Sequence, residues 1–204
     1  MKKLLVLAIV SLFAASAFAQ DPGVDGIGIY FDEAGMTNHL ASATPYSAVN
    51  AYVLGTNVSE PSGMSGYEFT IDIQPTPSIA PGYTQNGGGL NALTPPVFQV
   101  GACVLPGAPI IKMITIQLVY FGGEVSYYLG PCSPSSFGRF PYEDVPVGPG
   151  YAAGNDPGIL VRLTPSSNAP HPTLADFFKV AGILGDPPVA NVESSWGGVK
   201  ALYE

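Results

Sequence analysis

Apolar and polar residues alternate along several short stretches of the chain, and this period of two predicts β-strands. In the clearest stretch, 67–73, one face carries Tyr67, Phe69, Ile71 and Ile73, and the other carries Glu68, Thr70 and Asp72. Such strict alternation is typical of a strand with one solvated face, and hence of an antiparallel sheet. Further stretches of this kind lie at 27–31, 49–54, 97–103, 110–121, 125–129 and 159–163. Since Gly- and Pro-rich turns separate them, we expect an all-β, antiparallel β-sandwich over residues 20–165.

The pattern changes from strand-like to helix-like after residue 165. Apolar residues at helical spacing follow a capping Thr173 and precede Gly185; they are Leu174, Phe177, Phe178 and Ala181. This arrangement predicts a helix over 174–184. A second short helix is expected over 195–203, with Trp196 buried. We therefore expect 166–204 to be a short helical C-terminal segment packed on the sandwich.

The first nineteen residues have the pattern of a secretory signal peptide. Lys2 and Lys3 precede an apolar run from Leu4 to Phe13, and the small residues Ala17 and Ala19 stand at positions −3 and −1 of a cleavage site. The run is shorter than the roughly 20 residues that span a bilayer. Cleavage after Ala19 therefore predicts an exported chain, periplasmic or extracellular, whose mature part has no membrane span.

Composition adds that the exported protein is folded and acidic. The 25 Gly and 21 Pro among 204 residues approach the level of low-complexity chains, but 11 Tyr and 10 Phe are typical of a packed core. Fifteen acidic and seven basic residues give a net charge of −8, which becomes −10 once the two lysines of the signal peptide are removed. This charge argues against a nucleic-acid partner.

Two cysteines, Cys103 and Cys132, remain in the chain after export. Cysteines in an oxidising compartment most often pair, so we expect a Cys103–Cys132 disulfide. Two free buried thiols are the alternative.

Several short segments resemble known sandwich modules. Ala51–Leu54 with Asn57-Val58, followed by Gly66-Tyr67-Glu68-Phe69, is similar to the early strands of cohesin-like modules. Residues 130–138 and 196–203 look like segments of uncharacterised exported bacterial proteins. The resemblance implies a jelly-roll or cohesin-like sandwich, akin also to carbohydrate-binding modules, and a role in binding rather than catalysis. It supplies no functional residue.

Candidate catalytic groups are few, and their spacing is unfavourable. Glu68 and Asp72 share a strand face about 13 Å apart, whereas the paired carboxylates of glycosidases lie about 5 to 9.5 Å apart. Glu143 is the other acid considered, with Asp144 beside it in the sequence. His39 and His171 lie in no metal-binding or catalytic motif. We therefore expect no catalytic residue, no cofactor and no enzymatic activity, although cross-strand pairing of acids leaves a secreted hydrolase as a third hypothesis.

An acidic segment near the mature N-terminus offers a weak calcium pattern. Asp21, Asp25 and Asp32 occupy positions 1, 5 and 12 of an EF-hand-like loop, with Gly26 at position 6. Position 3 is Gly23, which supplies no side-chain ligand. The sequence therefore favours an acidic, solvated start over a metal site.

Three tyrosines suggest a second kind of surface. Tyr30, Tyr52 and Tyr128 fall opposite the main apolar face of their strands and would form a stacking surface for sugars if those strands were neighbours. The sequence therefore predicts a non-enzymatic interaction or structural module of the bacterial cell surface or secretome. Its expected partner is a protein. The alternative is a glycan-binding module with a polysaccharide ligand.

Overall fold

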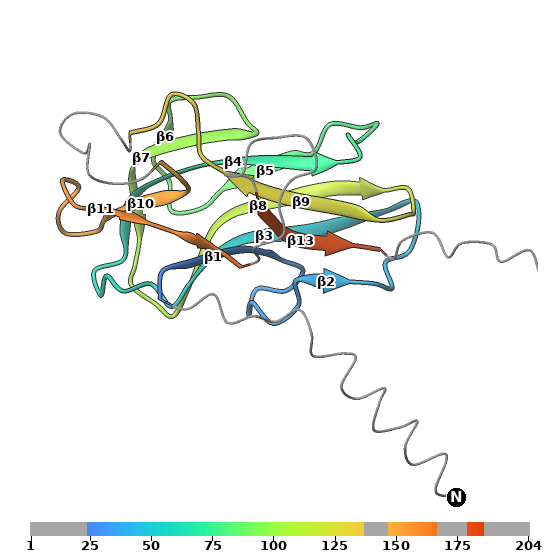
Figure 1. Cartoon of the computed structure of the whole chain (residues 1–204), viewed down its shortest axis with the longest axis horizontal. Helices are drawn as coiled ribbons and strands as arrows, with labels where there is room; N and C mark the ends of the chain where they lie inside the picture. The colour runs from blue at the N-terminus through green and yellow to red at the C-terminus, as the bar shows by residue number, and fades with distance from the viewer. Residues whose placement is uncertain (1–23, 137–146, 167–178, 186–204) are drawn as a thin grey trace, which may run out of the picture.

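The computed structural model describes residues 24–136, 147–166 and 179–185, and within them the chain is all-β, with no helix (Figure 1). The strands are β1 (Gly26–Tyr30), β2 (His39–Leu40), β3 (Ser47–Thr56), β4 (Met64–Gln74), β5 (Gly82–Gln85), β6 (Leu90–Asn91), β7 (Val97–Leu105), β8 (Ile110–Tyr120), β9 (Val125–Gly130), β10 (Gly150–Ala153), β11 (Leu160–Arg162), β12 (Thr164–Pro165) and β13 (Lys179–Leu184).

These strands form two mixed sheets. The first has the order β12-β1-β3-β8-β5, and the second has the order β11-β10-β4-β9-β13-β2. Strand β7 pairs with the free side of β4, and β6 pairs with β7. Most pairs are antiparallel, as expected, but β1 with β12 and β2 with β13 are parallel. The all-β prediction is confirmed, and the purely antiparallel one is not.

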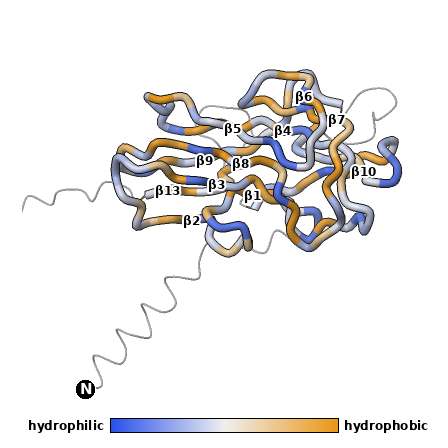
Figure 2. The backbone as a smooth tube through the Cα atoms, turned by 180° about the vertical axis from the view of Figure 1, so that it is seen from behind, coloured by the Kyte–Doolittle hydropathy of each residue, from blue (hydrophilic) through white to orange (hydrophobic). Residues whose placement is uncertain are grey.

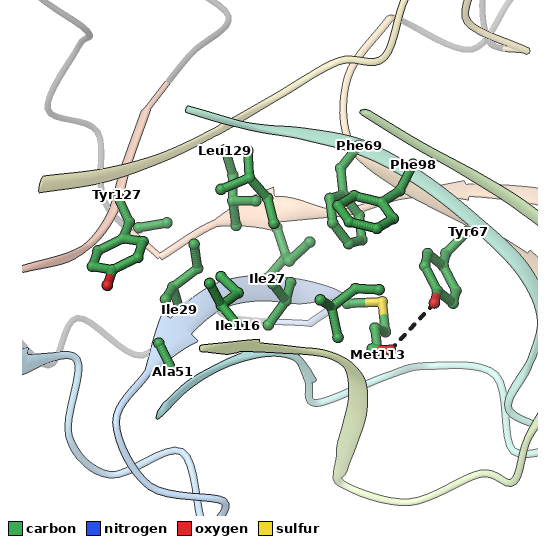
Figure 3. Packing of buried hydrophobic residues seen from close by; sticks show 14 of the residues in the cluster. Ile27, Ile29, Ala51, Tyr67, Phe69, Phe98, Met113, Ile116, Tyr127 and Leu129 are labelled. Atoms are coloured by element: carbon green, nitrogen blue, oxygen red, sulfur yellow. Dashed lines mark hydrogen bonds between the residues drawn. The ribbon is translucent and has the colours of Figure 1, made fainter. Parts of the chain in front are cut away.

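Side chains of both sheets meet in one hydrophobic core. Ile27 and Ile29 of β1 belong to the same buried cluster as Phe69 of β4 and Phe98 of β7 (Figure 3). Tyr67 spans the two sheets, because its hydroxyl donates a hydrogen bond to the Met113 carbonyl of β8. Figure 2 shows β8 as largely hydrophobic, whereas the loop beyond β10 is hydrophilic. The core thus fixes how the sheets pack and leaves their outer faces for other roles.

The period-two pattern located the main strands correctly. Each of the seven stretches expected to be extended contains a strand. The predicted apolar face of β4, Tyr67 to Ile73, is buried as expected. On the opposite face, Thr70 and Asp72 are half-buried, but Glu68 is only 4% exposed. The expectation that Glu68 faces water is therefore wrong, and the reason is the chain that covers it.

The helix predicted over 174–184 is wrong where the structure describes it. Residues 179–184 form β13, which pairs with β9 from Lys179 opposite Leu129 to Leu184 opposite Val125. Gly182 also lies so close to β1 that a Cβ there would approach the Ile29 carbonyl oxygen to 2.6 Å. The hydrogen bonds to β9 and the close packing of Gly182 on β1 of the other sheet outweigh the local preference for a helix that the spacing of the apolar residues indicates. The helix expected at 195–203, Trp196 and the signal peptide lie outside the described residues.

Cys103 and Cys132 are buried thiols that are not bonded to each other, so the predicted disulfide is wrong. The Cys103 thiol lies against the Met64 carbonyl at the start of β4. Cys132 lies on the other side of β4, two residues beyond Gly130, which pairs with Thr70. Met64 and Thr70, the β4 residues beside these two places, are six positions apart along the strand, roughly 20 Å at about 3.3 Å per residue. Disulfide formation requires Cα atoms within about 7 Å.

Several tyrosines are buried, and burial raises the pKa of their hydroxyl groups. Burial raises the pKa of Tyr83 to about 12, with a further contribution from the charge of Asp72. Burial also raises the pKa of Tyr151 to about 12, and the Asp25 carboxylate, which accepts a hydrogen bond from its hydroxyl, adds to the rise. Since an unfolded tyrosine ionises near pH 10, the folded chain holds these protons more tightly than the unfolded chain does.

We therefore expect the contribution of these tyrosines to the free energy of unfolding to be constant below about pH 9. The free energy of unfolding should then fall as the pH rises from about 10 to 12. Urea unfolding at pH 8 and pH 11 measures the difference. Tyr151→Phe should fold less stably at pH 8 but lose less stability between the two pH values. Equal losses in the variant and the natural protein would contradict the role of Tyr151.

Candidate binding groove

The outer face of the second sheet carries a groove of about 560 Å³. Its floor is built by β10, β4 and β7, which lie side by side. On β4 the residues that alternate with the buried Tyr67 and Phe69, namely Gly66 and Glu68, point away from the core and line the groove. The groove is therefore separate from the core between the sheets.

Small residues in register hollow out this floor. Gly66 pairs with Ala152 on one side and with Gly101 on the other, so three adjacent strands carry almost no side chain along one row. Gly66 is needed there, since a Cβ would approach the Val100 carbonyl oxygen to 2.8 Å. A Cβ on Gly101, by contrast, would meet nothing within 4 Å. Above Gly101 the groove is open.

Two leucines close the ends of the same row. Leu160 of β11 pairs with Ala152, and Leu90 of β6 pairs with Gly101. At about 4.8 Å per strand, the four strand spacings place these leucines roughly 19 Å apart. Leu90 is 77% exposed. The row Leu160–Ala152–Gly66–Gly101–Leu90, here called the leucine-bounded row, is thus an apolar furrow that runs across the strands.

A buried carboxylate forms one flank of the groove. The carboxylate of Glu68 accepts hydrogen bonds from the Ser135 hydroxyl and from the Ser136 amide, the latter at 3.0 and 3.1 Å to its two oxygens. Gln99 Nε2 reaches the Ser136 hydroxyl at 3.1 Å and Glu68 Oε2 at 3.4 Å. Charge-assisted bonds of this kind are stronger than neutral ones. These hydrogen bonds to Glu68 therefore hold residues 135 and 136 in place as a wall on one side of the groove.

Carboxylates are sparse in the described part of the groove. Among the described residues that line the groove, Glu68 is the only carboxylate, and its oxygens are engaged by the chain itself. Asp72 lies on the same strand but does not line the groove, and its Oδ2 accepts a hydrogen bond from Gln74. Glu143 and His171 lie outside the described residues. His39 Nε2 lies 3.2 Å from the Gly185 carbonyl oxygen, a contact within the fold.

The three tyrosines singled out from the sequence do not form one surface. Tyr30 and Tyr52 face each other on β1 and β3 of the first sheet, whereas Tyr128 lies on β9 of the second. Tyr30 and Tyr128 are buried, and Tyr52 is half-buried with the Lys112 ammonium 5.5 Å from its ring centroid. The possible stacking surface of all three tyrosines is therefore not formed, because β9 belongs to the other sheet and Tyr30 and Tyr128 are buried.

The acidic N-terminal pattern does not become a calcium loop either. Asp25 and Asp32 lie beyond opposite ends of the extended β1, roughly 23 Å apart at about 3.3 Å per residue. Asp25 instead accepts hydrogen bonds from the Ser59 amide and the Tyr151 hydroxyl, each at 2.8 Å. Asp21 lies outside the described residues. Within the described ranges no three His, Cys, Asp or Glu side chains gather in a metal-binding cluster.

Comparison of the chain with models of protein families, with curated proteins and with solved structures finds no match. The part of the chain that the structure describes contains no helix long and apolar enough to cross a membrane.

Proposed function

We propose that this protein is an exported, non-enzymatic interaction module of the bacterial cell surface or secretome, with a β-sandwich architecture. Its groove binds an uncharged, apolar segment of a partner protein. Two sheets around one core support the sandwich, and the N-terminal sequence pattern supports export. The observation that carries the binding function is the leucine-bounded row, a furrow with a small-residue floor and a leucine at each end.

The chemistry of the lining favours a protein segment over other ligands. Leu90, Leu160 and Pro157 offer apolar surface, and burial of such surface is the main source of affinity in protein association. Gln99 and Ser136 on the flank supply hydrogen-bonding groups near the row. A partner side chain can approach the sheet closely, because the floor residues have at most a Cβ. Among the lining residues that the structure describes, none is an exposed aromatic ring on which a sugar would stack.

Filling the groove should abolish partner binding without unfolding the protein. Gly101→Phe places a ring in open space within the groove, since no atom lies within 4 Å of its Cβ position. Gly82→Phe is the matched control: it is also an exposed strand glycine, but on β5 of the other sheet, with only ordinary contact to Gln117. Both variants should unfold in urea within about 1 kcal/mol of the natural protein, as is usual for surface changes.

The natural protein and both variants are then used to capture proteins from solubilised envelopes of the host. We expect one partner to be retained by the natural protein and by Gly82→Phe, with at least about tenfold less on Gly101→Phe. A photoactivatable group on the thiol of Leu90→Cys should crosslink to the same partner. Equal capture by Gly101→Phe, or capture without crosslinking from position 90, would overturn the proposal.

A further inference from the structure

Two exposed aromatic side chains meet at the end of the fold away from the groove. Tyr46, just before β3, is 80% exposed, and Phe121, just after β8, is 43% exposed. Their ring centroids lie 6.0 Å apart, with the ring planes at 87°. All other aromatic side chains in the described ranges are buried or half-buried. The two exposed rings are 75 positions apart in the sequence but lie in contact in the fold. They therefore form one surface feature rather than two unrelated exposed residues.

The backbone holds this pair in place. Tyr46 has a φ of 61°, which is unfavourable for a bulky residue, and its amide donates a 2.6 Å hydrogen bond to the Tyr120 carbonyl. Ser47 then pairs with Tyr120, so the first pair of the β3–β8 ladder sets the backbone positions that carry both rings. Tyr46 is thus kept in a strained conformation that presents its ring to solvent, and strain of this kind tends to gather at functional sites.

We propose that Tyr46 and Phe121 form a notch that binds a pyranose ring of a neutral polysaccharide. Two rings at right angles make two walls: one receives the apolar C–H face of the sugar, and the other contacts its edge. Aromatic faces carry partial negative charge, which attracts the electron-poor C–H groups. The Tyr46 hydroxyl can exchange hydrogen bonds with sugar hydroxyls.

The charge around the notch favours a neutral sugar over a membrane surface. Residues 40–50 and 117–123 contain no Asp, Glu, Lys or Arg. Peripheral binding to an anionic membrane relies on Lys and Arg near the surface, whereas this chain carries a net charge of −8. A neutral polysaccharide needs no such counter-charge. The notch therefore matches a sugar ligand in both shape and charge.

The notch and the groove can be tested separately because they lie at opposite ends of the sheets. The groove lies beside Tyr67, in the first half of β4. The Tyr67 hydroxyl donates a hydrogen bond to the Met113 carbonyl of β8. The residues beside Met113 pair with Val53 and Leu54, near the end of β3. Tyr46 precedes the other end of β3, eight residues or roughly 26 Å from Leu54 at about 3.3 Å per residue. Gly101→Phe should leave sugar binding unchanged.

The purified protein is incubated separately with insoluble cellulose, insoluble xylan, and vesicles of anionic phospholipid, and the bound fraction is measured by depletion. Tyr46→Asn removes the ring but accepts a positive φ, and Phe121→Ala removes the second ring. Val104→Ala, a change at another exposed apolar residue, is the control. We expect binding to a polysaccharide, weakened about three- to tenfold by each aromatic variant and unchanged by Val104→Ala.

Each remaining outcome overturns the inference. The inference is wrong if neither polysaccharide depletes the protein from solution. It is also wrong if Tyr46→Asn binds the polysaccharide as well as the natural protein does. Depletion by vesicles alone, lost in Tyr46→Asn, would replace the sugar with a lipid surface. Urea unfolding of each variant confirms that the loss of binding does not come from loss of the fold.

Discussion

Gly63→Ala should lower the free energy of unfolding by at least about 3 kcal/mol, the largest effect expected from a single methyl group here. Gly63 has a φ of 79°, a region that costs a non-glycine residue about 1 to 3 kcal/mol. Its Cβ would also overlap the Leu105 carbonyl oxygen and the Gly107 amide nitrogen, which are backbone atoms that cannot rotate away. Urea unfolding followed by circular dichroism measures the loss.

A second glycine separates these two causes. Gly88 has a φ of 68°, close to that of Gly63, but a Cβ there would meet nothing within 4 Å. Gly88→Ala should therefore show only the conformational cost, about 1 kcal/mol. If the two variants were equally stable, steric exclusion at Gly63 would play no part.

The position of Gly63 explains why this loss would matter for binding. Gly63 directly precedes β4, and its carbonyl accepts a hydrogen bond from the Gly154 amide, which directly follows β10. A Cβ on Gly154 would in turn collide with the Ser62 carbonyl. The close backbone packing at this junction therefore aligns two of the three strands that form the floor of the groove.

Glu68→Ala should lower the free energy of unfolding by about 2 to 4 kcal/mol and weaken partner binding. The substitution removes the acceptor for the Ser135 hydroxyl and the Ser136 amide, and unsatisfied buried donors cost about 1 to 3 kcal/mol each. Ser136 lines the groove, so its release should change the wall as well as the stability. Urea unfolding and the envelope capture assay measure the two effects.

Asp72→Ala is the matched control for Glu68→Ala, since Asp72 lies on the same face of β4 four residues further on. It is half-buried and does not line the groove, so we expect a loss of about 1 kcal/mol or less and unchanged capture. A larger loss in Asp72→Ala than in Glu68→Ala would contradict the structural role assigned to the Glu68 carboxylate.

The sequence by itself predicted the elements whose signal is local. Period-two alternation located β4 and β8, because a strand between a core and an outer face repeats every two residues whatever its neighbours are. The same pattern placed Phe69 and Ile71 in the core correctly. Cohesin-like topology, the signal peptide and export remain predictions from sequence patterns.

Only the tertiary structure decided which strands are neighbours, and the candidate sites depend on that pairing. Gly66, Gly101 and Ala152 have no common sequence signal, yet their register creates the floor of the groove. Tyr46 and Phe121 meet because β3 pairs with β8.

The wrong predictions have the same cause. Cys103 and Cys132 are not bonded to each other, Glu68 is covered by chain 67 positions later in the sequence, and 179–184 extends along β9 instead of coiling. Local periodicity determines which face of an element is apolar, whereas long-range pairing determines what that face meets.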